Sequence, residues 1–178
     1  LPEMYNIDVG DDNKIYTEAS GKKDGIPVIF VHGGPGGQCR SEHHSLFNPQ
    51  IFRSIIFDQR GCGKSIPYRS LEGNNTENLV EDIEKIRDFY KIKKFLIVGG
   101  SWGATLAIKY ALKFPKNLIG VLLRSVFLGT INEINWAFID GPKNFAPNLY
   151  KTFEGYSNGK EIIDCLLYTS PSPRDQLQ

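Results

Sequence analysis

The chain has 178 residues, of which 40% are hydrophobic and 23% charged, as expected for a globular domain large enough to hold a sizeable core. Its 21 Lys and Arg against 20 Asp and Glu leave a net charge of +1, so electrostatics give no reason to expect a nucleic acid or an anionic membrane as partner. Apolar runs stay well short of the ~20 residues of a membrane-spanning helix and no signal peptide opens the chain, so we expect no membrane association.

Cysteines and histidines show no metal-ligand pattern. Cys39, Cys62 and Cys165 are an odd number of cysteines without the spacing of a disulfide framework or a metal site. The adjacent His43 and His44 have no further ligand at a suitable spacing, so we expect a surface or packing role for them. We therefore expect no metal and no other cofactor, and a reducing compartment, by default the cytoplasm. Nothing in the sequence reports the oligomeric state.

The N-terminal part of the chain reads as strands. Two short strands are predicted at residues 4–9 and 14–20, and the continuous apolar run at 27–31 is typical of a buried parallel strand. That run ends in His-Gly-Gly-Pro-Gly-Gly at 32–37, where the glycines let the backbone approach a ligand and turn its amides inward. The competing interpretation, a dinucleotide fingerprint, fails because Cys39 stands where G-x-G-x-x-G requires its third glycine.

A further buried strand is predicted at 54–57, followed by Asp-Gln-Arg-Gly-Cys-Gly-Lys-Ser at 58–65. The end of this stretch is similar to a phosphate-binding loop. However, Asp58 occupies the position of the required first glycine, and Pro67 blocks the helix that should follow. We therefore reject nucleotide binding, and we expect Asp58 and Arg60 to pair with each other in a turn that braces the site.

A helix is predicted after residues 74–76, where Asn, Asn and Thr are good helix caps. Its apolar face is formed by Leu79, Val80, Ile83, Ile86 and Tyr90. The opposite face is expected to be an ordinary solvated surface, with Glu81, Asp82, Glu84, Lys85 and Asp88. This helix leads into the apolar run 95–98, which is predicted to be the next buried strand.

The stretch Gly-Gly-Ser-Trp-Gly at 99–103 is the most informative in the chain. Because it lies between a strand and a helical segment, its G-x-S-x-G pattern predicts a nucleophile elbow with Ser101 at the apex. Gly99 and Gly103 are expected where a Cβ would strike the adjacent strand or helix. The amide of Trp102, at the positive end of the helix, would point to a developing oxyanion. The alternative is a glycine-rich turn with an incidental serine.

The helix that follows is predicted to end before Pro115, and a last apolar strand is expected at 119–128. Strands that alternate with helices predict an α/β protein with a parallel sheet. Further on, aromatic residues and prolines without strand alternation suit a lid or cap. We expect three parts: a core at 1–130, the start of a helical cap at 131–164, and a disordered or non-native tail at 165–178.

Five segments together resemble the proline iminopeptidases (prolyl aminopeptidases): HGGPGG at 32–37, DQRGCGKS at 58–65, NNTENLVEDIEKIR at 74–87, GGSWGATLA at 99–107 and LLRSVFL at 122–128. The combination of HGGPGG with GGSWG is the most specific. The resemblance implies an α/β-hydrolase fold, a mostly parallel twisted sheet flanked by helices, here truncated after about the sixth strand and followed by the start of a helical cap. It also implies a serine exopeptidase that releases N-terminal proline from peptides.

Site residues follow from the resemblance by position. Ser101 would be the nucleophile, the backbone N–H groups of Trp102 and Gly34 would form the oxyanion hole, and Phe127 would line the pocket for the proline ring. Ala137 stands where family members often place a second pocket aromatic. Two alternatives stay open: another serine esterase or amidase of the same fold, and a non-catalytic protein that kept the scaffold.

The order of residues predicts that a catalytic base is missing from this chain. Triads of this fold run Ser, then Asp or Glu, then His along the sequence. His32, His43 and His44 are the three histidines, and all of them precede Ser101. The aspartates after Ser101 do not stand where the family places its acid, beyond the cap. We therefore expect the chain to be an N-terminal fragment of the enzyme and to be inactive by itself.

Overall fold

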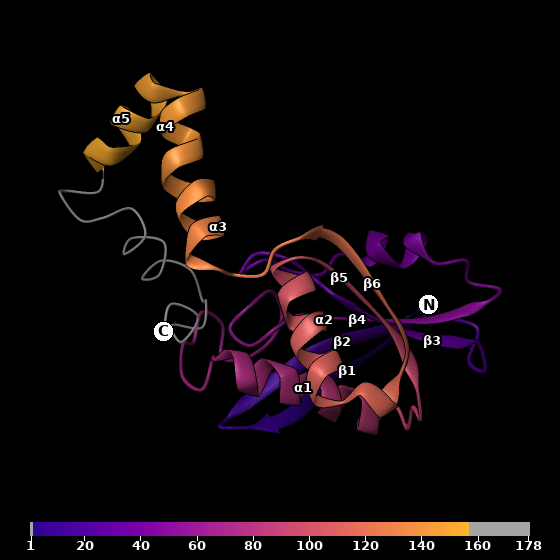
Figure 1. Ribbon diagram of the computed structural model, residues 1–178. Helices are drawn as coiled ribbons and strands as arrows, with labels where there is room; N and C mark the ends of the chain where they lie inside the picture. Colours follow the sequence, from indigo (N-terminus) through magenta and orange to yellow (C-terminus); the bar gives the residue numbers. More distant parts are fainter. Residues whose placement is uncertain (1, 157–178) are drawn as a thin grey trace.

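In the computed structural model, which describes residues 2–156, six strands form one sheet in the order β1-β2-β4-β3-β5-β6 (Figure 1). The strands are β1 (Glu3–Gly10), β2 (Asn13–Gly21), β3 (Ile26–Val31), β4 (Phe52–Phe57), β5 (Phe95–Ser101) and β6 (Leu118–Val126). β2 pairs antiparallel with β1 and β4, whereas the β4–β3, β3–β5 and β5–β6 pairs are parallel. The prediction of a mostly parallel α/β sheet is confirmed.

Helices α1 (Thr76–Phe89) and α2 (Trp102–Lys113) pack against one face of the sheet and bury the main core there (Figure 1). Side chains alternate along a strand, so every second residue of β3 and β5, among them Ile29, Val31 and Ile97, faces these helices. Burying each such side chain stabilises the fold by about 1.5–3 kcal/mol. The short 3-10 helix η1 (Ser41–Leu46) follows β3, and η2 (Pro115–Asn117) joins α2 to β6.

The predicted apolar face of α1 is confirmed, since Leu79, Val80, Ile83, Ile86 and Tyr90 are all buried. Its N-cap is Asn75, whose side chain accepts a hydrogen bond from the backbone N–H of Asn78 at 2.9 Å. One assignment to the solvated face is wrong. Asp82 is only 1% exposed, because its carboxylate is the partner of a buried arginine.

That arginine is Arg60, just after β4. Its Nε and Nη2 donate to the two carboxylate oxygens of Asp82 at 2.7 and 3.0 Å, and its Nη1 donates to Asp11 at 2.9 Å. The expected pair between Asp58 and Arg60 is therefore wrong. Arg60 reaches α1, where a carboxylate accepts a bidentate bond, whereas Asp58 faces the loop after β3 and accepts a backbone N–H bond from Cys39 at 2.6 Å.

β6 is the last strand in the order of the described sheet, and much of it is solvent-exposed. Its apolar side chains Ile119, Val121, Leu122 and Val126 are between 44% and 59% exposed.

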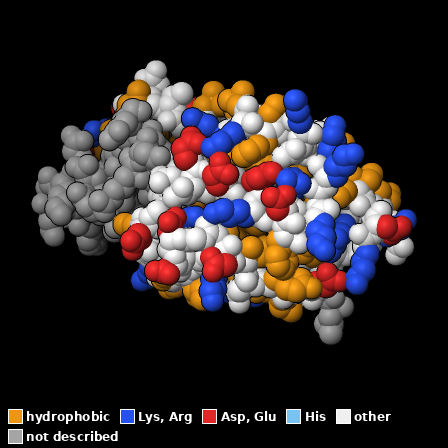
Figure 2. Space-filling model, turned by 90° about the horizontal axis from the view of Figure 1, so that it is seen from below, with side chains coloured by type: hydrophobic (Ala, Val, Ile, Leu, Met, Phe, Trp, Pro, Cys, Tyr) orange, Lys and Arg blue, Asp and Glu red, His pale blue; other side chains and the backbone are white. Residues whose placement is uncertain are grey.

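The charged side chains on the face seen from below form no patch of a single sign. Figure 2 shows that basic and acidic groups are interspersed there.

After β6 the chain continues into a group of helices that stands away from the sheet: α3 (Ile131–Asn135), the π-helical turn η3 (Trp136–Asp140), α4 (Gly141–Phe145) and α5 (Pro147–Tyr156) (Figure 1). At its start, the Glu133 carboxylate accepts bonds from the backbone N–H groups of Leu128 and Thr130, both at 3.1 Å. The remainder of the expected cap and the expected tail lie outside the described residues. Within residues 2–156 none of the helices has the length and apolar character that crossing a bilayer requires.

Candidate active site

The turn from β5 into α2 has the strand–turn–helix geometry that a nucleophile elbow requires. Ser101 ends β5 and is the N-cap of α2, with φ 55° and ψ −123°. A non-glycine residue rarely adopts positive φ, and such strain is concentrated at functional sites. The turn leaves the Ser101 side chain exposed at the carboxyl end of the strand, while the side chain of the next residue, Trp102, is buried.

Two glycines make this turn possible. A Cβ on Gly99 would overlap the carbonyl oxygen of Gly103, and a Cβ on Gly103 would overlap the carbonyl oxygen of Val31 in β3. Both obstacles are backbone atoms, which cannot move aside as the end of a flexible side chain can. The prediction that these two positions have no room for a side chain is confirmed.

The loop at residues 32–37 runs directly beside the elbow. A Cβ on Gly33 would lie 3.0 Å from the carbonyl oxygen of Gly100 and 3.3 Å from the Cβ of Ser101. Gly34 has a φ of +137°, which side chains rarely adopt, and its peptide bond to Pro35 is cis. The structure thus brings the loop that contains Gly34 into contact with the predicted nucleophile.

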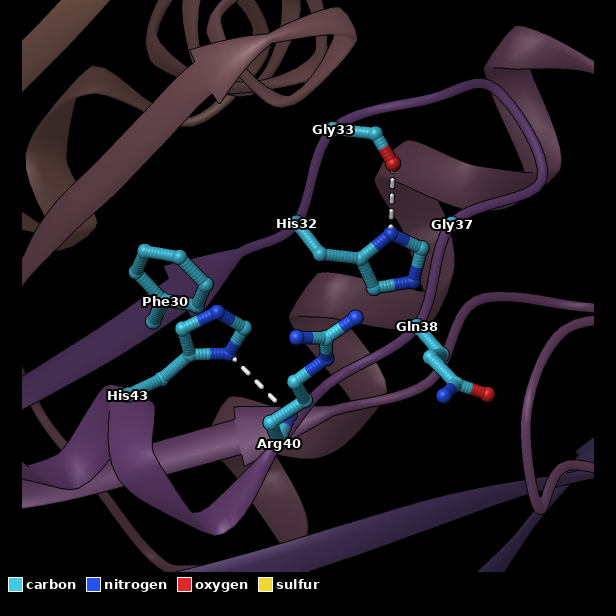
Figure 3. A pocket seen from close by; sticks show the side chains of 7 residues that line it. All are labelled: Phe30, His32, Gly33, Gly37, Gln38, Arg40 and His43. Atoms are coloured by element: carbon cyan, nitrogen blue, oxygen red, sulfur yellow. Dashed lines mark hydrogen bonds between the residues drawn. The ribbon is translucent and has the colours of Figure 1, made fainter.

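His32 lies at the start of this loop, and its ring nitrogens are bonded to residues other than Ser101. Its Nε2 accepts a bond from the backbone N–H of Gln59 at 3.1 Å, and its Nδ1 lies 2.8 Å from the carbonyl oxygen of Gly33, to which it donates (Figure 3). Burial lowers the pKa of His32, so the ring is neutral with its proton on Nδ1. Both ring nitrogens are engaged, which leaves neither free to accept the serine proton.

A pocket of about 370 Å³ adjoins the loop on the side of β3 and η1 (Figure 3). Its lining residues are Phe30, His32, Gly33, Gly37, Gln38, Arg40 and His43. The His43 ring packs against Phe30 with 4.6 Å between the ring centroids, and burial, followed by the nearby Arg40, lowers the pKa of His43. The ring nitrogen Nδ1 of His44 forms a hydrogen bond with Ser54 Oγ at 2.7 Å. The two histidines therefore have the packing roles that the sequence predicts.

Phe127 lies at the same end of the sheet as the elbow. In the pairing of β5 with β6, Ser101 lies opposite Val126, the residue just before Phe127. The Phe127 carbonyl oxygen accepts a bond from Thr105 Oγ1 at 2.5 Å, which fastens the end of β6 to α2. Ala137, in contrast, lies in η3, within the group of helices that stands away from the sheet.

Comparison with known proteins fits this geometry. Residues 26–165 match the model of the α/β hydrolase fold family. The chain belongs to this family. This α/β-hydrolase is 45% identical over 163 residues to the proline iminopeptidase of Arabidopsis thaliana, an alignment that covers 89% of this chain and 43% of the relative. It is 48% identical over 130 residues to the proline iminopeptidase of Neisseria gonorrhoeae, which covers 73% of this chain and 42% of the relative.

Among solved structures, a proline iminopeptidase-related protein from Thermus thermophilus matches this α/β-hydrolase with a TM-score of 0.60 and 29% identity, over 69% of this chain and 44% of that one. The resemblance predicted from the sequence motifs is confirmed. The chain spans less than half the length of each of these three proteins.

Sequence reasoning missed what the residues after β4 do in this α/β-hydrolase. Asp58 accepts backbone N–H bonds from Cys39 at 2.6 Å and Lys64 at 2.8 Å, and Gln59 bonds to both His32 and Trp102. A signal was available, because these residues directly follow a buried parallel strand. The carboxyl ends of parallel strands meet at one edge of the sheet, where ligands bind in α/β folds.

The described residues offer no obvious metal centre. Within residues 2–156, no cluster of three or more His, Cys, Asp and Glu side chains is arranged to hold a metal ion. The elbow and the loop beside it supply backbone N–H groups and a hydroxyl instead. These are the groups that acyl transfer to a serine uses.

Proposed function

We propose that this α/β-hydrolase is part of a proline iminopeptidase, a serine exopeptidase that releases the N-terminal proline of peptides. The observation that carries the proposal is the strained Ser101 at the apex of the elbow, with the His-Gly-Gly-Pro-Gly-Gly loop packed against it through Gly33. The likeness to proteins named proline iminopeptidase supports this choice of substrate over other acyl compounds.

In the proposed mechanism, Ser101 Oγ attacks the carbonyl carbon of the N-terminal prolyl residue and forms an acyl-enzyme, which water then hydrolyses. The backbone N–H groups of Trp102 and Gly34 stabilise the oxyanion. Trp102 is the first residue of α2, so its N–H has no acceptor within the helix and lies at the positive end of the helix dipole. Each such donor contributes about 10²–10³ in kcat.

The proton acceptor and its acidic partner come, in this proposal, from the part of the complete protein that this chain does not contain. Three observations support this. The chain has no histidine after Ser101, and His32 has both ring nitrogens engaged. The chain also spans less than half the length of the relatives that it matches.

Phe127 is proposed to line the pocket for the proline ring. Its place after β6, beside the residue paired with Ser101, puts it at the edge of the sheet where the acyl group would lie. An aromatic ring gives a flat apolar surface against which a proline ring can pack. The small side chain of Ala137 leaves the cap side of the pocket without a second aromatic at that position.

Cytoplasmic localisation is proposed from the cysteines. Cys39 and Cys62 are free thiols, and burial raises the pKa of both, that of Cys62 to about 12. Thiols of this kind are unreactive, and they persist unpaired in reducing compartments.

The proposal is tested with the complete protein and three substrates: proline p-nitroanilide, alanine p-nitroanilide and p-nitrophenyl acetate. Turnover should be fastest with the proline anilide, and Ser101→Ala should lower kcat by about 10⁶. Ser45→Ala, an exposed serine on η1, is the matched control and should leave kcat unchanged. Turnover of the acetate alone would favour an esterase. No Ser101-dependent turnover of any substrate would favour a non-catalytic protein.

A further inference from the structure

The two proposed oxyanion donors belong to segments that are far apart in the sequence. Gly34 lies in the loop after β3, and Trp102 is the first residue of α2. Their N–H groups can serve one oxyanion only if the loop and the helix keep a fixed separation. The contact of Gly33 with the elbow limits how closely they approach. A non-bonded contact of this kind does not by itself hold two segments together.

One buried side chain bridges the two segments. Gln59, two residues beyond the end of β4, is 2% exposed. Its Nε2 donates to the carbonyl oxygen of His32 at 2.8 Å, and its Oε1 accepts from the indole Nε1 of Trp102 at 3.1 Å. Its backbone N–H donates to His32 Nε2 at 3.1 Å. A single residue thus holds the start of the loop, the His32 ring and the first residue of α2.

The strength of this bridge comes from its burial. A buried polar group without a partner is costly, whereas a fully paired one keeps its neighbours in a single arrangement. Both ends of the Gln59 amide are paired, and Trp102 is itself 1% exposed. The arrangement is stiff because the Gln59 amide, the His32 carbonyl oxygen and the Trp102 indole would each lose a hydrogen bond if the loop and the helix shifted.

We propose that Gln59 is a positioning residue for the oxyanion hole, which holds the Gly34 and Trp102 donors at the separation that acyl transfer requires. Its hydrogen bonds go to His32 and Trp102, and it acts through these two residues. This inference rests on the proposed function only in requiring serine acyl transfer at Ser101. It does not depend on proline being the substrate.

The amide chemistry explains why glutamine is suited to this position. The bridge needs one donor and one acceptor at the end of a side chain of this length. Methionine has a similar length but neither strong group. An ionised glutamate can accept from Trp102 but cannot donate to the His32 carbonyl oxygen, whereas a protonated glutamic acid can do both. Ionisation of the carboxyl group in Gln59→Glu therefore removes the donor of the bridge, and protonation restores it, while the shape of the side chain stays the same.

The first test is Gln59→Met in the complete protein, with kcat expressed per active site titrated with a fluorophosphonate. A misplacement of about 1 Å costs on the order of 10²-fold, so we expect kcat to fall about 10–100-fold, while KM changes less than about 3-fold. Gln50→Met, at an exposed turn, is the matched control and should keep wild-type kcat. A purely structural role would lower the number of active sites and leave kcat per site unchanged, which would overturn the proposal.

The second test is the pH profile of Gln59→Glu, and it works even if the methionine variant does not fold. Burial raises the pKa of a carboxyl group, so the variant titrates in an accessible range. The ratio of its kcat to that of the wild type should approach one at low pH and fall as the pH rises and the carboxyl ionises. Taking the ratio removes the titration of the catalytic base. A ratio that does not change with pH would overturn the proposal.

Both tests are run with proline p-nitroanilide and with p-nitrophenyl acetate, because an oxyanion forms on either carbonyl. If the wild type hydrolyses only the acetate, the proposed proline specificity fails while the role of Gln59 is still measured. If the wild type hydrolyses neither substrate through Ser101, both proposals fail.

Discussion

Gly99 and Gly100 are neighbours in the elbow, but their surroundings differ. A Cβ on Gly99 would overlap the carbonyl oxygen of Gly103, whereas a Cβ on Gly100 would have its nearest neighbour, the carbonyl oxygen of Arg124, at 3.6 Å. The latter is an ordinary van der Waals distance. The G-x-S-x-G pattern makes the same distinction, because it requires glycine at position 99 and leaves position 100 variable.

We therefore predict that Gly99→Ala destabilises the complete protein by about 1–3 kcal/mol, since overpacking forces the backbone to shift. Because the displaced backbone belongs to the elbow, kcat should fall as well. Gly100→Ala is the matched control and should change stability by less than about 0.5 kcal/mol. Urea unfolding and proline p-nitroanilide turnover measure both effects. Equal behaviour of the two variants would contradict the prediction.

Asp82 shows where prediction at single residues fails. Helical periodicity places it on the face of α1 expected to be solvated, yet it is buried by Arg60, a residue 22 positions earlier in the chain. The periodicity of one helix gives no information about a partner residue that belongs to another segment of the chain. The sequence predicts Asp58 as the acceptor of Arg60 for the same reason, because the true acceptor on α1 is distant in the sequence.

This buried pair leads to a second prediction. Asp82→Ala leaves the Arg60 guanidinium without its bidentate partner, which costs about 3–5 kcal/mol of the free energy of unfolding. Asp88→Ala removes an exposed carboxylate on the same helix, from a surface ion pair with Arg87, and should cost less than about 1 kcal/mol. Chemical denaturation of the two variants of the complete protein makes the comparison. Similar losses would show that the Asp82–Arg60 pair is not a major stabilising contact.

At the scale of elements, the strands and main helices were predictable because their signals are local. A buried parallel strand is a continuous apolar run, so the predicted strands at 27–31 and 54–57 differ from β3 and β4 by only one or two residues at one end. The elbow was predictable for the same reason, since strand, serine and helix follow one another. The bridge through Gln59 was not, because its partners lie 27 and 43 positions away.

β6 leads to a prediction about the isolated chain. Its exposed apolar residues and its outer edge, with which no strand within residues 2–156 pairs, provide a template for pairing with another chain. We expect the isolated 178-residue chain to aggregate, to bind a hydrophobic dye and to show no cooperative melt. A monodisperse monomer with a sharp thermal transition would contradict this.

A pair of variants separates the strand from exposed apolar surface in general. Leu122→Lys places a charge on β6 and should reduce aggregation, because a charged edge strand resists pairing. Leu112→Lys removes a more exposed leucine, 77% against 59%, from α2 and should have little effect. Light scattering at equal concentration compares the two variants.

At the scale of the whole molecule, the described residues include the proposed nucleophile Ser101, but His32, at the start of the loop beside it, has both ring nitrogens engaged. We predict that the isolated chain hydrolyses proline p-nitroanilide no faster than its Ser101→Ala variant, since loss of a triad member costs about 10⁶ in kcat. The complete protein serves as the positive control in the same assay. Turnover by the isolated chain that depends on Ser101 would show that a base lies within it.

The junction after β6 has a consequence for how this α/β-hydrolase can diversify. Ser101, the loop at 32–37 and the residues after β4 all precede Leu128 in the chain, and the helices beyond are joined to the sheet at Glu133 by bonds to Leu128 and Thr130. Insertions or exchanges in the gene within this helical segment therefore leave the elbow, the loop beside it and the Gln59 bridge unchanged. These helices can be exchanged as one contiguous piece, while the part of the site that precedes Leu128 is inherited intact.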